Sequence, residues 1–182
     1  MADPHNMKRY GETWPLDRIC ACLEELQYIR EHIIISGGWA WHFISPPGHT
    51  ELKHAHDHKD IDIFVRPHNV TTVINALATR GFKKVPTKYD HLKGNNDFRR
   101  YEKVKDSHKI TVDFFINKDI PSREIRGWLV VDPTSLIPLY STIHSSSSCF
   151  AVVAAQKLLA EGQDPVGREE LVQIPKGIRE KN

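Results

Sequence analysis

The stretch HKDIDIFV, residues 58–65, decides how this sequence is interpreted. Its β-branched, apolar run is typical of a strand that buries one face, yet it carries Asp60 and Asp62. Side chains alternate across a strand, so these aspartates share one face, about 6.5–7 Å apart, and the intervening apolar side chains face the core. The pattern therefore predicts a strand that presents two carboxylates on one side.

A second apolar strand supplies a third carboxylate. The segment KITVDFFI, residues 109–116, carries Asp113, and pairing of the two strands would bring it beside Asp60 and Asp62. Three adjacent carboxylates repel one another and are costly to hold ionised without a cation. Hard oxygen ligands suit Mg²⁺ or Mn²⁺, and a pair of such ions can clamp both oxygens of a phosphoryl transfer. The sequence predicts a metal site here, and a solvated strand end is the simpler alternative.

A double glycine lies upstream of the aspartates. HIIIS, residues 32–36, predicts a short strand that Gly37 and Gly38 end, and WAWHFI, residues 39–44, begins a helix. Glycines let the backbone approach a phosphate closely, and a helix N-terminus directs amides at it. We therefore expect a phosphate-binding turn, with an ordinary tight turn as the alternative.

The remaining patterns describe a mixed α/β or α+β domain. Helices are predicted over 15–30, 70–80 (closed by Gly81), 148–161 and 168–174, strands over 82–89, 97–104 and 127–133, and a helical turn over 134–140. We expect a core over residues 1–131 and a C-terminal helical segment over 132–182, packed together as a single compact domain.

Composition narrows the class of protein. The 182 residues carry a formal net charge of +2, too small to require nucleic acid or a membrane as partner. The sequence contains no signal-peptide pattern and no apolar run of membrane-spanning length, so we expect a cytoplasmic protein, with the nucleus as an alternative. Cys20, Cys22 and Cys149 have no zinc-type spacing and fit small thiols in a reducing compartment.

The motif order GGWAWHF, HKDIDIFV and VDFFI resembles the nucleotidyltransferase superfamily that includes DNA polymerase β, and most closely its small aminoglycoside and lincosamide nucleotidyltransferases. The resemblance is specific over residues 34–65 and agrees at Asp113; elsewhere only the element order matches. It implies a small mixed sheet flanked by helices and two Mg²⁺ ions. It also implies transfer of a nucleoside monophosphate from a nucleoside triphosphate, with ATP expected, to a small-molecule hydroxyl, releasing pyrophosphate.

The resemblance also implies a role for each acidic residue. Asp60 and Asp62 would hold the metals and the triphosphate. Asp113 would help to bind the catalytic metal and act as general base for the acceptor hydroxyl.

Other positions carry over as nucleotide contacts. Ser36, Gly37 and Gly38 would contact the β and γ phosphates. His58 matches a histidine that the antibiotic-modifying members carry two positions before their paired aspartates, and Lys157 matches a lysine that faces the triphosphate.

Two positions depart from that family's pattern. His42 stands where an acidic residue is usual, and His56 stands where an arginine is usual. Both lie beside the predicted triphosphate site. The C-terminal helical region is also short for an acceptor-binding domain, so a partner or a second copy of the chain, as in a homodimer, would be one way to hold the acceptor.

Three alternatives stay open. The histidines at 49, 54, 56 and 58 could form a transition-metal site such as a zinc site. The chain could be a non-catalytic nucleotide-binding relative. It could also modify RNA or a protein, since residues 83–105 gather basic side chains that would suit an RNA backbone: Lys83, Lys84, Lys88, Lys93, Arg99, Arg100, Lys103 and Lys105.

Overall fold

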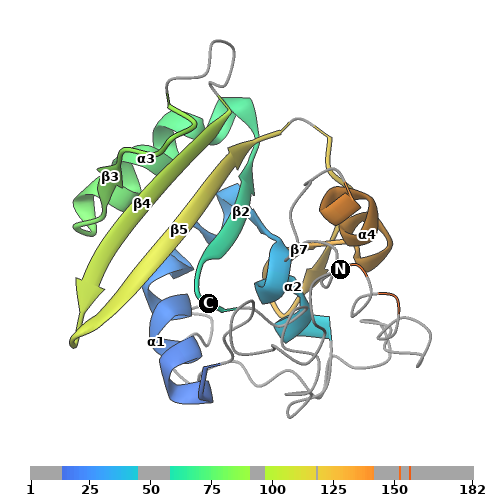
Figure 1. Cartoon of the computed structure of the whole chain (residues 1–182), viewed down its shortest axis with the longest axis horizontal. Helices are drawn as coiled ribbons and strands as arrows, with labels where there is room; N and C mark the ends of the chain where they lie inside the picture. The colour runs from blue at the N-terminus through green and yellow to red at the C-terminus, as the bar shows by residue number, and fades with distance from the viewer. Residues whose placement is uncertain are drawn as a thin grey trace.

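A computed structural model describes residues 14–44, 58–90, 97–117 and 119–141, and the single positions 152 and 156 (Figure 1). The helices are α1 (Leu16–Leu26), α2 (Gly37–Ile44), α3 (Val70–Thr79) and α4 (Pro133–Ser141), with 3₁₀ helices η2 (Gln27–His32) and η4 (Pro67–Asn69). The strands are β1 (Ile33–Ile35), β2 (Ile61–Val65), β3 (Lys83–Val85), β4 (Phe98–Lys105), β5 (His108–Ile116), β6 (Ser122–Ile125) and β7 (Trp128–Val131).

The seven strands form one mixed sheet in the order β3-β4-β5-β2-β1-β7-β6. Strand β2 runs parallel to β5, and β1 runs parallel to β7. The other neighbouring pairs are antiparallel. The predicted pairing of the two aspartate-bearing strands is therefore confirmed, as is the mixed α/β class.

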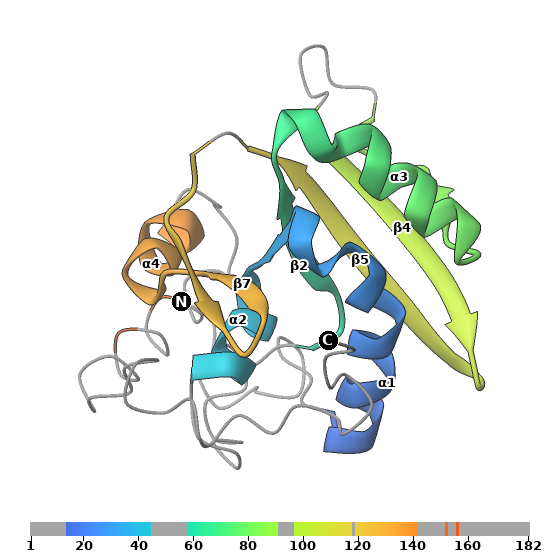
Figure 2. The same cartoon turned by 180° about the vertical axis from the view of Figure 1, so that it is seen from behind.

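Helices cover the two faces of the sheet unequally. Figure 2 looks onto the face of β4 and β5 that α1 and α3 cross. Figure 1 looks onto the opposite face, where no described helix lies over these two strands. We call this side of β4 and β5, which no described helix covers, the open face.

Strand β2 shows the alternation that the sequence predicts. Ile61, Ile63 and Val65 are fully buried, whereas Asp62 and Phe64 are half-buried. Full burial of such aliphatic side chains contributes about 1.5–3 kcal/mol each. The strand is thus fixed by its apolar face, and its other face presents Asp62 and Phe64.

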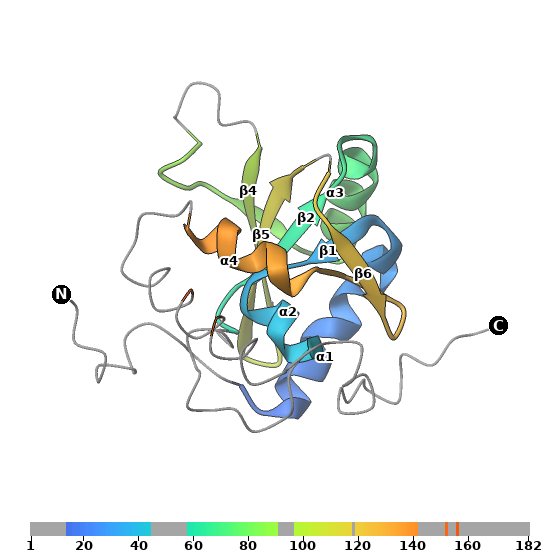
Figure 3. The same ribbon diagram turned by 90° about the vertical axis from the view of Figure 1, so that its right-hand side faces the viewer.

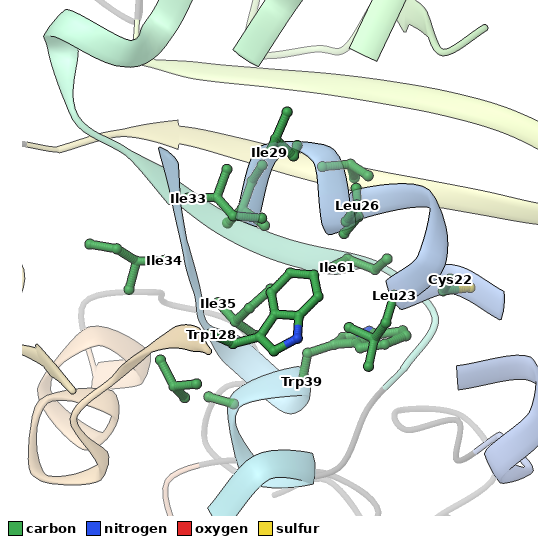
Figure 4. Packing of buried hydrophobic residues seen from close by; sticks show 14 of the residues in the cluster. Cys22, Leu23, Leu26, Ile29, Ile33, Ile34, Ile35, Trp39, Ile61 and Trp128 are labelled. Atoms are coloured by element: carbon green, nitrogen blue, oxygen red, sulfur yellow. The ribbon is translucent and has the colours of Figure 1, made fainter. Parts of the chain in front are cut away.

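The core lies between β1, β2 and helix α1. Figure 4 shows Ile33 and Ile61 from the sheet close to Leu26 of α1, with the rings of Trp39 and Trp128 beside them. All five side chains are fully buried. This packing holds β1 and β2 in place, and with them the start of α2.

Strand β4 agrees within one residue with the predicted strand 97–104, whereas the predicted strand 82–89 is shortened to β3. A hairpin of 82–89 with 97–104 is confirmed only over Lys83–Val85, while β4 pairs along its whole length with β5. The turn between β4 and β5 is the two residues Asp106 and Ser107, with φ of 50° and 65°. Positive φ at both central positions is the geometry that matches strand twist in a two-residue hairpin.

Two further boundaries are corrected. Helix α2 begins at Gly37 rather than at Trp39, and Ser122–Ile125 forms a strand that the sequence analysis did not predict. This strand, β6, is antiparallel to β7. The turn that joins them is Arg126 and Gly127, which also have positive φ. A charged four-residue segment gives little strand signal without its partner.

Helix α4 begins the predicted C-terminal segment and lies beside α2 (Figure 3). The indole nitrogen Nε1 of Trp41 donates a hydrogen bond to the hydroxyl of Tyr140 at 3.2 Å. The predicted helices 148–161 and 168–174 lie outside the described residues except for positions 152 and 156, which are helical. None of the described helices is both long enough and apolar enough to cross a membrane.

Candidate active site

The three predicted aspartates gather around the start of β2. Asp62 lies opposite Asp113 in the parallel register of β2 and β5. Neighbouring strands are about 4.8 Å apart, so these two residues are adjacent on the open face. Asp60 immediately precedes β2 and reaches the same guanidinium as Asp113. The structure thus brings together residues that the sequence separates by more than fifty positions.

Arg100 of β4 joins the three aspartates, and we call these four side chains the acidic row. In the β4–β5 register Arg100 lies directly opposite Asp113. Its Nε donates to Oδ1 of Asp113 at 2.6 Å and its Nη2 donates to Oδ2 at 2.6 Å, a bidentate pair. The same Nη2 lies 3.3 Å from Oδ2 of Asp60. The hydrogen bond with Asp113 raises the pKa of Arg100, against the effect of burial, so the guanidinium stays charged.

The double glycine lies against the carboxylate of Asp62. A Cβ on Gly37 would fall 2.0 Å from Oδ2 of Asp62, and Gly37 has φ of +59°. The amide of Ser36 donates to the backbone carbonyl of Asp62 at 2.9 Å. Gly38 is buried in the first turn of α2. Ser36 and Gly37 therefore adjoin the acidic row, and their contact with phosphate stays a prediction.

His58 occupies a different position from the one expected of a nucleotide contact. Its side chain is buried, with ring contacts to Trp14, Trp39 and His42. Its Nδ1 accepts a hydrogen bond from the amide of Trp14 at 3.1 Å, and its carbonyl accepts one from Nε1 of Trp39. His58 therefore anchors the chain before β2 in the core, and its nucleotide contact stays a prediction.

His42, one of the two departures from the family pattern, is also an internal residue. Its ring lies edge-on to those of Phe43 and His58. Its Nε2 is buried and has no hydrogen-bond partner among the described residues. Burial lowers the pKa of His42 from 6.5 to about 4, so the ring is neutral at pH 7.

An aromatic row follows the acidic row on the open face. The strand registers place Phe64, Phe115 and Phe98 next to one another. Each lies two residues along its strand from a member of the acidic row, and therefore on the same face of the sheet. Ring centroids are 5.5 Å apart for Phe64 and Phe115 and 5.0 Å apart for Phe115 and Phe98. The sequence analysis missed this row. Three half-buried rings beside three carboxylates offer an apolar surface next to a charged one.

The donors of the acidic row are of the chemical type that binds a divalent cation. Carboxylates of Asp60 and Asp113 already converge on one cationic nitrogen of Arg100, and carboxylate oxygens are the ligands that Mg²⁺ and Mn²⁺ prefer. In this conformation no group of three or more His, Cys, Asp or Glu side chains within the described ranges is arranged to hold a metal ion. Arg100 supplies the positive charge instead.

The structure does not test the other predicted residues. Lys157, His56 and the histidines at 49 and 54 are not among the described residues, so the zinc alternative stays a prediction. In the basic stretch, Lys103 and Lys105 form ion pairs with Glu25, and Arg100 is held by aspartates. These three side chains are therefore engaged in ion pairs within the protein, although the single carboxylate of Glu25 offsets only one of the two lysine charges.

Comparison with known proteins places the fold. No family model matches the chain, and no curated protein matches it in sequence. A solution structure of the antibiotic-resistance factor ANT(2'')-Ia, an aminoglycoside nucleotidyltransferase, superposes with a TM-score of 0.50 at 11% identity, over 85% of this chain and 91% of that one. A crystal structure of ANT(2")-Ia with adenylyl-2"-tobramycin gives a TM-score of 0.48 at 14% identity, over 81% and 91%. The chain therefore has a nucleotidyltransferase-type fold.

Proposed function

We propose that this protein is a Mg²⁺-dependent nucleotidyltransferase that moves a nucleoside monophosphate from a nucleoside triphosphate, ATP being the expected one, to the hydroxyl of a small molecule. The observation that supports this most strongly is that the carboxylates of Asp60 and Asp113 converge on the guanidinium of Arg100. Asp62 lies beside Asp113, and Gly37 lies against the carboxylate of Asp62. The fold shared with an aminoglycoside nucleotidyltransferase agrees with it.

Each residue has a distinct task in this proposal. Asp60 and Asp62, with help from Asp113, would hold the divalent cation, which would supply positive charge to the oxygens of the triphosphate. Gly37 and Gly38, in the first turn of α2, would direct backbone amides toward the triphosphate. Ser36, whose amide donates to the backbone carbonyl of Asp62, would contact the triphosphate through its hydroxyl. Asp113 accepts the proton of the attacking hydroxyl. Catalysis comes from positioning and charge rather than from a covalent enzyme intermediate.

In this proposal the acceptor binds on the side of Asp113 that is toward the C-terminal end of β5. The aromatic row of Phe64, Phe115 and Phe98 begins there, one step beyond Asp113. Aromatic rings pack well against flat or apolar faces of a ligand. Lys103 and Lys105 are engaged in ion pairs with Glu25, which gives less support to the alternative of an RNA acceptor. A protein acceptor and a non-catalytic nucleotide-binding role are the remaining alternatives.

Two substitutions separate binding from transfer. Asp62→Asn removes a charge from the proposed cation site, and we expect Mg²⁺–ATP affinity to fall by roughly tenfold or more. Asp113→Asn should keep that affinity within about threefold yet slow pyrophosphate release by about 10²–10⁴-fold, the range of general-base catalysis. Calorimetry measures the first, and a coupled pyrophosphate assay with amino sugars, nucleosides and aromatic alcohols as acceptors measures the second.

Asp119→Asn is the matched control, because Asp119 is an exposed aspartate just after β5. It should leave both quantities unchanged. A folded Asp62→Asn protein with wild-type Mg²⁺–ATP affinity would remove Asp62 from the site. An Asp113→Asn protein with wild-type turnover would remove Asp113 as the base.

A further inference from the structure

Among the residues that the structure describes, Arg100 is the cation that the strand register places inside the acidic row. Strands β4 and β5 are antiparallel, and Arg100 lies directly opposite Asp113. Directly opposite residues point to the same face of a sheet. Its neighbour Arg99 points to the other face, where its guanidinium lies 5.7 Å from the ring of Phe114 in the core. The two arginines are thus adjacent in sequence but opposite in surroundings.

The contacts of Arg100 are strong and specific. Both oxygens of Asp113 accept hydrogen bonds from it at 2.6 Å, and Asp60 accepts a third at 3.3 Å. Bidentate pairing of a planar guanidinium with a carboxylate is the strongest common form of ion pair. Only 9% of the side chain of Asp113 is exposed, so solvent screens the pair weakly.

The four side chains of the acidic row carry a net negative charge. Three carboxylates and one guanidinium leave two net negative charges among Asp60, Asp62, Asp113 and Arg100. Such a site still attracts a divalent cation. However, both oxygens of Asp113 are already engaged, so a metal that binds there must break at least one hydrogen bond to Arg100.

We infer that Arg100 is the resident counter-cation of this site, which holds Asp113 and Asp60 in the absence of a metal and makes metal binding conditional on nucleotide. The inference rests on the proposed function. A triphosphate brings negative charges to which the displaced guanidinium can transfer its hydrogen bonds, because guanidinium pairs with phosphate as it does with carboxylate. Nucleotide and metal then bind cooperatively, and each raises the affinity for the other.

The test uses Mn²⁺ alone, without nucleotide, titrated into the protein and followed by the electron paramagnetic resonance of the free ion. Arg100→Gln removes the competing cation, so Mn²⁺ should bind roughly tenfold more tightly than to the wild type. Mg²⁺–ATP affinity should fall, because the guanidinium that receives the phosphates is gone. A merely structural arginine would not move the two affinities in opposite directions.

Arg99→Gln is the matched control, with the same charge change at the next residue of β4. It should leave the Mn²⁺ affinity at the wild-type value, which excludes a general effect of net charge. Arg100→Lys keeps the charge but loses the bidentate fork, so its Mn²⁺ affinity should lie between those of the wild type and Arg100→Gln. This variant also keeps the test decisive if Arg100→Gln fails to fold.

The outcomes separate this inference from the proposed function. If Mg²⁺–ATP binds to the wild type but neither Arg100 variant gains Mn²⁺ affinity, the counter-cation role is wrong and the proposed function stands. If neither Mn²⁺ nor Mg²⁺–ATP binds to the wild type or to the Arg100 variants, both are contradicted. Opposite shifts of the two affinities in Arg100→Gln support both.

Discussion

At the residue scale, Gly37 ties the start of α2 to the acidic row. Its α-carbon lies so close to Asp62 that any side chain would displace the carboxylate. Its φ of +59° is also a conformation that residues with a Cβ rarely adopt. Glycine is therefore required at position 37 for two reasons: the positive φ of the backbone and the closeness of the Asp62 carboxylate.

We predict that Gly37→Ala lowers the free energy of unfolding by about 3 kcal/mol, because backbone strain adds to a steric clash with Asp62. It should also abolish Mg²⁺–ATP binding, since the displaced carboxylate can no longer hold the cation. Urea unfolding and calorimetry measure the two effects.

The matched control for this change is Gly81→Ala. Gly81 has φ of +84°, but a Cβ on this residue would meet no other atom within 4 Å, so only the backbone strain of about 1 kcal/mol applies. Equal destabilisation by the two substitutions, with ATP binding intact in both, would show that the clash with Asp62 is unimportant.

Single residues also show where sequence reasoning succeeds. Strict alternation in β2 predicts that Ile61 and Ile63 are buried and that Asp62 faces the other way, and the structure confirms it. His58 lies before the strand begins, so alternation says nothing of its direction. Its burial among aromatic rings depends on Trp14 and Trp39, which the sequence places far away.

At the scale of elements, the register of the β4–β5 hairpin decides the composition of the site. Alternation shows that Arg100 and Asp113 each lie on one face of a strand, but pairing across strands is not a local property. The two-residue turn at Asp106 and Ser107 sets the register. The turn has the Asp-Ser sequence instead of the strong Asn-Gly signal, so the sequence analysis did not identify it.

Helix α2 is another element whose surroundings the sequence does not reveal. Every residue from Gly37 to Ile44 except His42 is buried as a whole, and the buried Nε2 makes His42 an internal ionisable group as well. A helix that is apolar on all sides belongs to the interior. Protonation of its one histidine therefore opposes folding.

We predict a loss of stability in mild acid that originates at His42. Its pKa is about 4 in the folded protein and 6.5 ordinarily, so the unfolded chain binds more protons between these values. The stability that depends on a neutral His42 is fully present above pH 6.5 and is lost as the pH falls toward 4. Between pH 7 and pH 5 the free energy of unfolding should decrease by about 2 kcal/mol from this group.

Urea unfolding of His42→Gln at both pH values checks this. The variant should lack that part of the decrease, whereas His68→Gln, at an exposed histidine of η4, should retain it. An identical pH dependence in the wild type and His42→Gln would contradict the assignment.

At the scale of the whole molecule, one buried carboxylate joins elements from different parts of the chain. Glu25 of α1 is paired with Lys103 and Lys105 of β4, and Arg80 lies 3.6 Å away after α3. Burial alone would raise the pKa of Glu25, but hydrogen bonds from the two lysines outweigh it and lower the pKa. Helix α1 and the end of α3 are thereby attached to β4, the strand next to the edge strand β3.

The sequence predicts the architecture better than the details of the site. Periodicity and the two aspartate-bearing strands are sufficient for a mixed sheet with Asp62 near Asp113. The place of Arg100 beside Asp113, and the contact between Phe98 and Phe115, could not be identified from the sequence. Both depend on the alignment of β4 with β5. Local patterns determine elements, while the partners of a side chain depend on contacts distant in sequence.

The central claim is that the acidic row binds a nucleoside triphosphate through a divalent cation. The most direct test is a calorimetric titration of the protein with ATP, with and without Mg²⁺, repeated on Asp60→Asn. We predict binding that requires Mg²⁺ and is lost in the folded Asp60→Asn variant. Binding that is independent of Mg²⁺, or that is unchanged in Asp60→Asn, would contradict the claim.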